Sequence, residues 1–177
     1  MKILFVDCDG TIREPLSGEK FAKHPKDFKI IEGADQAISY YQRKGYRIEG
    51  ITNQGGVEAG HKTLDDCIQE QLYTLELFPE ISSILFCPDY AGKQCWRVYN
   101  NFGNKQALKV GERCNDLVGT YRKPGAGMIE YLLRMHLAKN RQNCYMVGDR
   151  PEDKQAATKA NIKFIDAEEW RKKYGFN

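Results

Sequence analysis

Short apolar runs alternate with longer amphipathic stretches along most of the chain. A short run with few polar interruptions is typical of a strand that is buried on both faces. Apolar residues spaced three and four apart indicate a helix instead, and such a stretch follows each predicted strand. The predicted strands lie at residues 3–6, 46–51, 84–86, 144–147 and 163–165, and the predicted helices near 34–41, 64–75, 128–136, 156–160 and the C-terminal end.

Strands that alternate with helices predict right-handed crossovers and a mainly parallel sheet with helices on both faces. We therefore expect an α/β fold, a Rossmann-like three-layer sandwich. The 177 residues are enough for one domain, spanning 1–177. A polar stretch at 88–120 breaks the alternation and is expected to be an irregular loop insertion. Residues 12–33 also look irregular, and they are too few for a large cap domain.

Polar motifs stand where three of the predicted strands end. Asp7 and Asp9 follow the first strand, Thr52 and Asn53 the second, and Asp149 the fourth. In such folds ligands bind at the carboxyl ends of the strands. Carboxylates two residues apart in an extended chain share one side, while the residue between them, Cys8, points the other way. Two like charges this close need a cation or a proton between them.

Composition and charge exclude several classes of protein. The chain is 41% hydrophobic and 29% charged with a net charge of +3, which is ordinary for a globular protein and too small to indicate nucleic-acid binding by itself. The sequence opens without a charged-then-apolar leader, and no apolar run approaches the roughly 18 residues of a membrane span. The six cysteines form no CxxC pair. We expect a cytoplasmic protein with reduced thiols.

Four stretches, in order, resemble the motifs of the haloacid dehalogenase (HAD) superfamily of phosphohydrolases. The resemblance spans nearly the whole chain except 88–120, and four motifs in order are a specific signal. It implies the HAD fold, here without a large cap, and an enzyme that hydrolyses phosphate monoesters. The stretches are Asp7-Cys8-Asp9-Gly10-Thr11, Thr52-Asn53-Gln54, Lys123-Pro124 and Gly148-Asp149-Arg150-Pro151-Glu152-Asp153.

The resemblance implies distinct roles for the acidic residues. Asp7 would attack phosphorus and form an aspartyl-phosphate, and Asp9 would protonate the leaving alcohol and then activate water. Mg²⁺ would be bound by a carboxylate oxygen of Asp7, the backbone carbonyl of Asp9 and the carboxylate of Asp149. We expect Asp7 to stay ionised and Asp9 to titrate at a higher pH than Asp7.

The remaining motif residues would surround the phosphoryl group. A phosphate dianion repels an anionic nucleophile, so the site needs hydrogen-bond donors and positive charge. By the same resemblance, Thr52, the amide of Asn53 and the ammonium of Lys123 would bind phosphoryl oxygens. Asp153 would hold Lys123 or a metal-bound water.

The residues around Tyr145–Asp149 resemble the histidinol-phosphate and heptose-bisphosphate phosphatases, which favours a small phosphorylated metabolite as substrate. Many of those enzymes carry a zinc loop before the Arg-Lys-Pro sequence. This chain has Cys87, Asp89, Cys95 and Cys114 there, without the histidine and the closing cysteine pair. The four could bind Zn²⁺, but the irregular spacing favours unrelated reduced cysteines.

Two alternatives stay open. Tyr121-Arg122-Lys123-Pro124 with Gly127-Met128 also resembles polynucleotide 3′-phosphatases, so a nucleic-acid 3′-phosphate end is a possible substrate. The other alternative is a non-catalytic module that binds phosphate or metal on the same fold. The first is favoured by cations and aromatic rings between 88 and 120, a combination that suits single-stranded nucleic acid: Lys93, Arg97, Lys105, Lys109 and Arg113 with Tyr90, Trp96, Tyr99 and Phe102.

Overall fold

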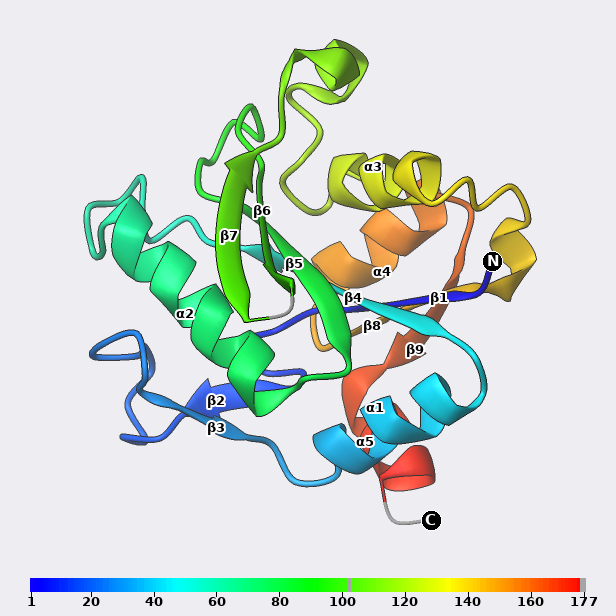
Figure 1. Ribbon diagram of the computed structural model, residues 1–177, viewed down its shortest axis with the longest axis horizontal. Helices are drawn as coiled ribbons and strands as arrows, with labels where there is room; N and C mark the ends of the chain where they lie inside the picture. Colours follow the sequence, from blue (N-terminus) through cyan, green and yellow to red (C-terminus); the bar gives the residue numbers. More distant parts are fainter. Residues whose placement is uncertain (102, 176–177) are drawn as a thin grey trace.

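A seven-stranded sheet forms the centre of the protein (Figure 1). The computed structural model describes residues 1–101 and 103–175. The strand order is β7-β6-β5-β4-β1-β8-β9, and the last two strands of one side, β6 and β7, are antiparallel additions to a parallel sheet. The strands are β1 (Ile3–Val6), β4 (Arg47–Asn53), β5 (Ile81–Cys87), β6 (Trp96–Asn101), β7 (Asn104–Lys109), β8 (Cys144–Gly148) and β9 (Lys163–Asp166).

Helices cover both faces of the sheet. On one face lie α1 (Ala34–Arg43), α2 (Leu64–Leu77) and α5 (Ala167–Tyr174); on the other lie α3 (Gly127–Met135) and α4 (Pro151–Lys159). Side chains of a strand alternate between faces, so Leu4, Val6 and Cys8 pack in the first core and Ile3 and Phe5 in the second. The predicted α/β sandwich is confirmed, and Cys8 is buried away from the site as predicted.

The prediction of an irregular insertion at 88–120 is wrong for its middle part. This segment contains the hairpin β6–β7, which continues the sheet beyond β5. Val98 is fully buried in the core beneath α2, and Trp96 and Ala107 pack against the same core. The rest of the segment holds a short 3₁₀ helix, η1 (Glu112–Leu117); another, η2 (Arg141–Asn143), precedes β8.

The stretch at 12–33 is also more regular than predicted. It forms a two-stranded antiparallel hairpin of β2 (Arg13–Pro15) and β3 (Phe28–Ile30), separate from the main sheet. Arg13 and Phe28 are buried, so the hairpin is attached to the body of the protein at its base. Within the described residues, every helix is too short or too polar to cross a lipid bilayer.

The strand order places β1 where the direction of winding reverses. From β1 the chain builds outward through β4 and β5, and it later returns to the other side of β1 to add β8 and β9. Val6 is in register with Gly50 of β4 and with Val147 of β8. The carboxyl ends of these strands therefore meet around Asp7, at the position where parallel α/β sheets bind ligands.

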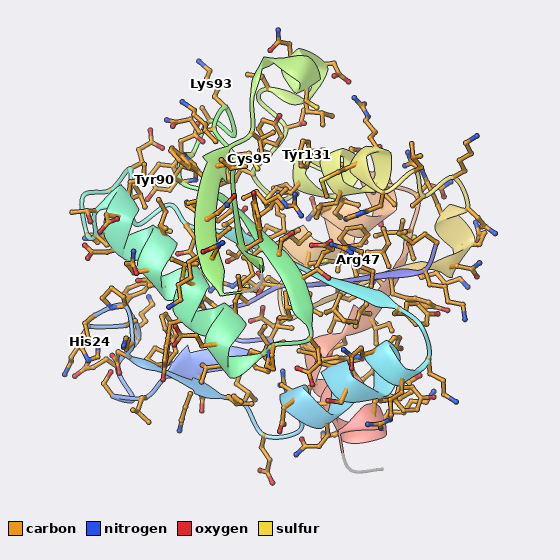
Figure 2. All side chains as sticks on the ribbon, viewed as in Figure 1. His24, Arg47, Tyr90, Lys93, Cys95 and Tyr131 are labelled. Carbon is orange, nitrogen blue, oxygen red and sulfur yellow. The ribbon has the colours of Figure 1, made fainter. Side chains whose placement is uncertain are left out.

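A buried carboxylate stands near the other end of β4. Glu49 is fully buried and accepts hydrogen bonds from Ser83 (2.5 Å) and Arg47 (2.5 Å), while the His136 ring nitrogen lies at 2.8 Å. Arg47 is labelled in Figure 2. Burial alone would raise the pKa of Glu49, but these three partners together lower it. The charge inside the sheet is thus held by partners from β4, β5 and the end of α3.

Candidate active site

Asp7 lies directly after β1 and forms a buried ion pair with Lys123. The Lys123 ammonium contacts Asp7 Oδ1 at 2.5 Å, Asp153 Oδ1 at 2.6 Å and the carbonyl oxygen of Ile51 at 3.1 Å. Burial raises the pKa of Asp7 to about 7, although Lys123 opposes this shift. The predicted contact between Asp153 and Lys123 is confirmed.

Asp7 also belongs to a cluster of three carboxylates. Asp7, Asp149 and Asp153 each offer an oxygen, and these oxygens lie within 4.8 Å of one another. The Thr11 hydroxyl bridges two of them, at 3.2 Å from Asp7 Oδ2 and 3.4 Å from Asp149 Oδ1. An all-oxygen donor set of this kind suits a hard divalent cation such as Mg²⁺. Asp7 and Asp149 meet as the sequence predicts, and Asp153 joins them.

Gly10 makes room for this cluster. Its φ of +85° lies in the left-handed region, and a Cβ on it would stand 2.5 Å from Asp149 Oδ2. Any other residue would be strained there and would push the carboxylate away. The glycine that follows the two aspartates is therefore part of the site.

Asn53 holds the backbone of Lys123 from the end of β4. Its Oδ1 accepts from the Lys123 N–H at 2.9 Å, and its Nδ2 donates to the Lys123 carbonyl at 2.8 Å. The side chain thus positions Lys123, and one Nδ2 hydrogen remains for another acceptor. Thr52 is almost fully buried beside it and accepts from Gln54 Nε2 at 3.0 Å, so its own O–H is left to donate.

The carboxyl of Asp9 is held by two donors away from Asp7. Arg13 Nε donates to Oδ1 at 2.8 Å, and Gln54 Nε2 donates to Oδ2 at 2.7 Å. Partial burial would raise the pKa of Asp9, but Arg13, Lys62 and Gln54 together lower it. Since the pKa of Asp7 is raised, the expectation that Asp9 titrates at a higher pH than Asp7 is wrong for this state. The cause is Arg13, whose role the sequence did not indicate.

The profile of the polynucleotide kinase 3 phosphatase family matches residues 2–171. The chain belongs to this family. Among curated proteins, it is 28% identical over 172 residues to the D-glycero-β-D-manno-heptose-1,7-bisphosphate 7-phosphatase of Haemophilus ducreyi, covering 92% of this chain and 80% of the relative. It is 27% identical to the corresponding phosphatase of Chlorobaculum tepidum, covering 93% and 77%.

Among solved structures, the chain resembles a D,D-heptose 1,7-bisphosphate phosphatase from B. bronchiseptica, complexed with magnesium and phosphate. The TM-score is 0.67 at 21% identity, and the match covers 93% of this chain and 79% of the other. This chain is a HAD-type phosphatase, a phosphoric monoester hydrolase. The predicted superfamily and enzyme class are confirmed.

In this family member the candidate zinc residues make other contacts. The Cys87 thiol lies 3.3 Å from Asp89 Oδ1, and the Asp89 carboxylate accepts from the backbone N–H groups of Lys93 and Gln94 at 2.9 and 3.0 Å. Among the described residues, the acidic cluster is the one group of three or more potential ligands that is close enough for a shared metal. Asp89 therefore shapes the loop after β5.

The aromatic residues between 88 and 120 lie in surroundings that differ from one ring to the next. Trp96 packs on the core, Tyr90 lies under the Arg122 guanidinium at 4.9 Å, and Tyr99 lies under Arg97 at 4.9 Å. Tyr90 and Lys93 are labelled in Figure 2, and Phe102 lies outside the described residues. Each of these three rings therefore packs on the core or beside an arginine of the protein itself.

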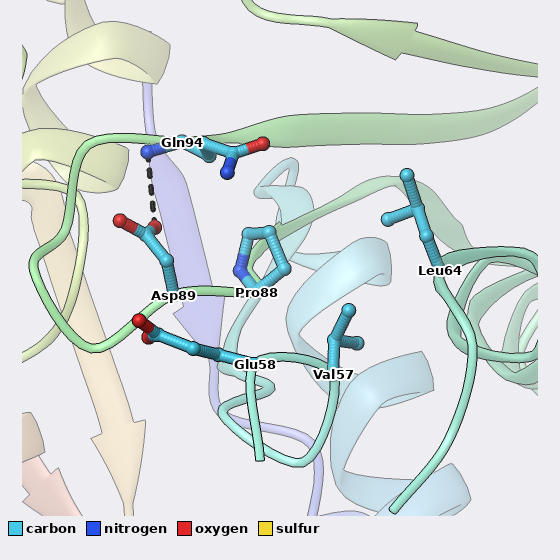
Figure 3. Close-up of a pocket in the computed structure, with 6 residues that line it drawn as sticks. All are labelled: Val57, Glu58, Leu64, Pro88, Asp89 and Gln94. Carbon is cyan, nitrogen blue, oxygen red and sulfur yellow. Dashed lines mark hydrogen bonds between the residues drawn. The ribbon is translucent and has the colours of Figure 1, made fainter. Parts of the chain in front are cut away.

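Two pockets adjoin the strand ends. One of about 280 Å³ lies between the loop after β4 and the loop after β5, lined by Val57, Glu58, Leu64, Pro88, Asp89 and Gln94 (Figure 3). The other, of about 500 Å³, is lined by residues that include Asp149, Arg150, Lys154 and Phe164. The second pocket therefore reaches the acidic cluster, whereas the first contains none of the residues predicted to bind Mg²⁺ or phosphate.

Proposed function

We propose that this protein is a Mg²⁺-dependent phosphatase that removes a phosphate group from a phosphorylated sugar, of the sugar-bisphosphate type, through an aspartyl-phosphate on Asp7. The observation that carries the proposal is that Asp7 pairs with a buried ammonium and lies beside two further carboxylates. A binding module would need the cation ligands and the ammonium, but it would not need Asp9 as an acid.

In the first half-reaction, a carboxylate oxygen of Asp7 attacks phosphorus and the bond from phosphorus to the sugar oxygen breaks. Asp9, which takes up a proton when the substrate dianion enters beside it and raises its pKa, gives that proton to the sugar oxygen, so the sugar leaves as an alcohol. We propose that the Thr52 hydroxyl and the free Asn53 hydrogen bind phosphoryl oxygens as charge develops on them. Lys123 would join them once one of its two carboxylates has moved away.

In the second half-reaction, a water molecule attacks the phosphorus of the aspartyl-phosphate and passes its proton to the Asp9 carboxylate. The bond from phosphorus to the Asp7 oxygen breaks, which regenerates the Asp7 carboxylate and releases inorganic phosphate. Asp9 ends with its proton restored, so the cycle is closed. Splitting one displacement into two is the advantage of a covalent nucleophile.

The residues present fit a magnesium ion. Asp7, Asp149 and Asp153 provide hard oxygen donors, and Gly10 leaves the space that Asp149 needs. We propose Asp7, Asp149 and the backbone carbonyl of Asp9 as ligands, with Asp153 beside them. A bound Mg²⁺ would supply positive charge that lets phosphate approach the anionic Asp7.

The sugar substrate is supported by the relatives, whose names give heptose-1,7-bisphosphate as the compound on which they act. A nucleic-acid 3′-phosphate end is the second candidate, and the name of the family favours it. The two differ in salt dependence, because binding a nucleic-acid backbone releases counterions. We expect kcat/KM to be higher on sugar phosphates than on 3′-phosphorylated oligonucleotides; a salt-sensitive preference for oligonucleotides would reverse this assignment.

The covalent mechanism is tested by Asp7→Asn. We expect kcat on p-nitrophenyl phosphate and on sugar phosphates to fall by about 10³ or more, and acid-quenched wild-type protein to carry radiolabelled phosphate that the variant lacks. Asp116→Asn is the matched control, since Asp116 is exposed and pairs with Arg134 on the surface. Near-normal turnover by Asp7→Asn would disprove the nucleophile.

A further inference from the structure

We infer that Arg13 and Gln54 are positioning residues that fix the Asp9 carboxyl for protonation of poor leaving groups, through a closed ring of contacts anchored on α2. The inference rests on the proposed function and deepens it. The ring runs from Asp9 through Arg13 to Glu70, and back from Glu70 through Lys62 and Gln54 to Asp9.

The need for positioning follows from the location of Asp9. Its side chain is 42% exposed on the loop after β1, so the side that faces solvent does not restrict its rotamers. Each carboxyl oxygen nevertheless accepts one strong hydrogen bond, from Arg13 at 2.8 Å and from Gln54 at 2.7 Å. A second lone pair stays free on each oxygen, so Asp9 can still carry and release a proton.

Arg13 is a rigid support because its guanidinium is fixed on several sides. The side chain is fully buried and Phe28 of the β2–β3 hairpin stacks on it at 4.0 Å. Nη1 donates to the Glu70 carbonyl at 3.1 Å and to the Thr74 hydroxyl. Burying an arginine is costly unless it is paired, and its one carboxylate contact is Asp9 among the described residues.

Gln54 forms the second arm, and Lys62 sets its orientation. The Lys62 ammonium donates to Gln54 Oε1 at 2.6 Å and to Glu70 Oε2 at 2.5 Å. An amide whose oxygen faces a cation must turn its NH₂ group the other way, toward Asp9 and Thr52. Both arms therefore end on Glu70, which is itself buried in α2.

The ring matters most where a proton must be delivered. A sugar leaves as a basic alkoxide unless Asp9 protonates its oxygen as the bond to phosphorus breaks, whereas p-nitrophenolate is stable without a proton. A small displacement of a catalytic group can cost about a hundredfold in rate. Loss of either arm should therefore lower activity on alkyl phosphates selectively.

The test compares Arg13→Met and Gln54→Met, which keep approximate size but lose the donors, with wild-type protein. The readout is kcat/KM, which reports steps up to phosphoryl transfer, on a sugar phosphate and on p-nitrophenyl phosphate. We expect a fall of about tenfold to a hundredfold on the sugar phosphate and less than about threefold on the aryl ester. Lys105→Met, which removes a surface pair with Glu76, should leave both values unchanged.

Equal losses on both substrates, or no loss on either, would overturn the inference. Should Arg13→Met fail to fold, Gln54→Met and Lys62→Met decide the question, because they alter the other arm without opening the buried site of Arg13. A wild-type protein inactive on both substrates would instead overturn the proposed function, and no variant is needed to see that result.

Discussion

Lys123 is the positive charge that makes the buried acidic cluster tolerable. It lies between Asp7 and Asp153, and all three groups are nearly inaccessible to solvent. Removing one partner of a buried ion pair leaves an uncompensated charge, which is more costly than losing a surface pair.

We therefore predict that Lys123→Met abolishes turnover and destabilises the protein. At pH 8 with EDTA, its unfolding free energy should be lower than that of wild type by roughly 3 kcal/mol. Added Mg²⁺ should raise the melting temperature of the variant more than that of wild type, since a cation can replace the lost charge. Urea and thermal denaturation measure both effects, with Lys105→Met as control; an equal magnesium response would contradict the placement of the cation site.

Gly10→Ala tests the space beside Asp149. The new methyl group would stand at 2.5 Å from the carboxylate oxygen, on a backbone with φ of +85°. We expect phosphatase activity to fall at least about tenfold and the magnesium concentration for half-maximal activity to rise, because Asp149 must move. Gly18→Ala is the matched control, since Gly18 also has a positive φ but faces open space; it should leave the magnesium dependence unchanged.

At the residue scale, the sequence predicts which residues carry the chemistry. It does not predict what sets their pKa values. Asp7 and Asp149 meet as predicted, because each follows a strand and the carboxyl ends of parallel strands share one edge of the sheet. Lys123 reaches the same site from the loop before α3. Arg13 and Lys62 could not be assigned, since each looks like an ordinary charged residue in a turn. Their partners, Asp9 and Glu70, become visible only when the hairpin and α2 are packed together.

At the scale of elements, β4 carries two different polar sites. Thr52 and Asn53 end the strand at the active site, while Glu49 is buried near its start. The hairpin β6–β7 escaped prediction because one of its faces is polar: Val98 is buried and Trp96 and Ala107 pack on the core, but the residues of β7 are otherwise exposed. Half-buried edge strands give a weak periodic signal.

The buried Glu49 predicts a specific acid sensitivity. Its pKa is held below the ordinary value of 4.5, so the folded protein binds this proton less readily than the unfolded chain. Its stabilisation is therefore complete above pH 4.5 and is lost as the pH falls below that value. Glu49→Gln should be less stable at pH 7 by about 1 to 3 kcal/mol, and its unfolding free energy should decline less steeply between pH 5 and 3. Exposed Glu76→Gln should retain the wild-type slope.

At the scale of the whole molecule, two cores lie on opposite faces of one sheet. The single domain expected from chain length remains a prediction, and the two tryptophans allow a direct test. Trp96 reports on the added hairpin, and Trp170 is a fully buried residue of α5.

We predict that the protein unfolds as one cooperative unit. In Trp96→Phe and in Trp170→Phe, the remaining fluorescence and the far-UV circular dichroism should change at the same urea concentration, because the hairpin shares a core with α2. A fluorescence transition of Trp96 that precedes the loss of helix would mean that the hairpin is a separately melting part.

The three contacts of the Lys123 ammonium have a kinetic consequence. An ammonium has three hydrogens, and here Asp7, Asp153 and the Ile51 carbonyl take all of them. A phosphate oxygen can contact the Lys123 ammonium only after Asp7 or Asp153 has moved away from it. A cation bound between these two carboxylates would compete for their oxygens and so free one hydrogen of the ammonium. The expected order of addition is therefore cation first and phosphoester second, with inorganic phosphate binding only weakly to the metal-free protein.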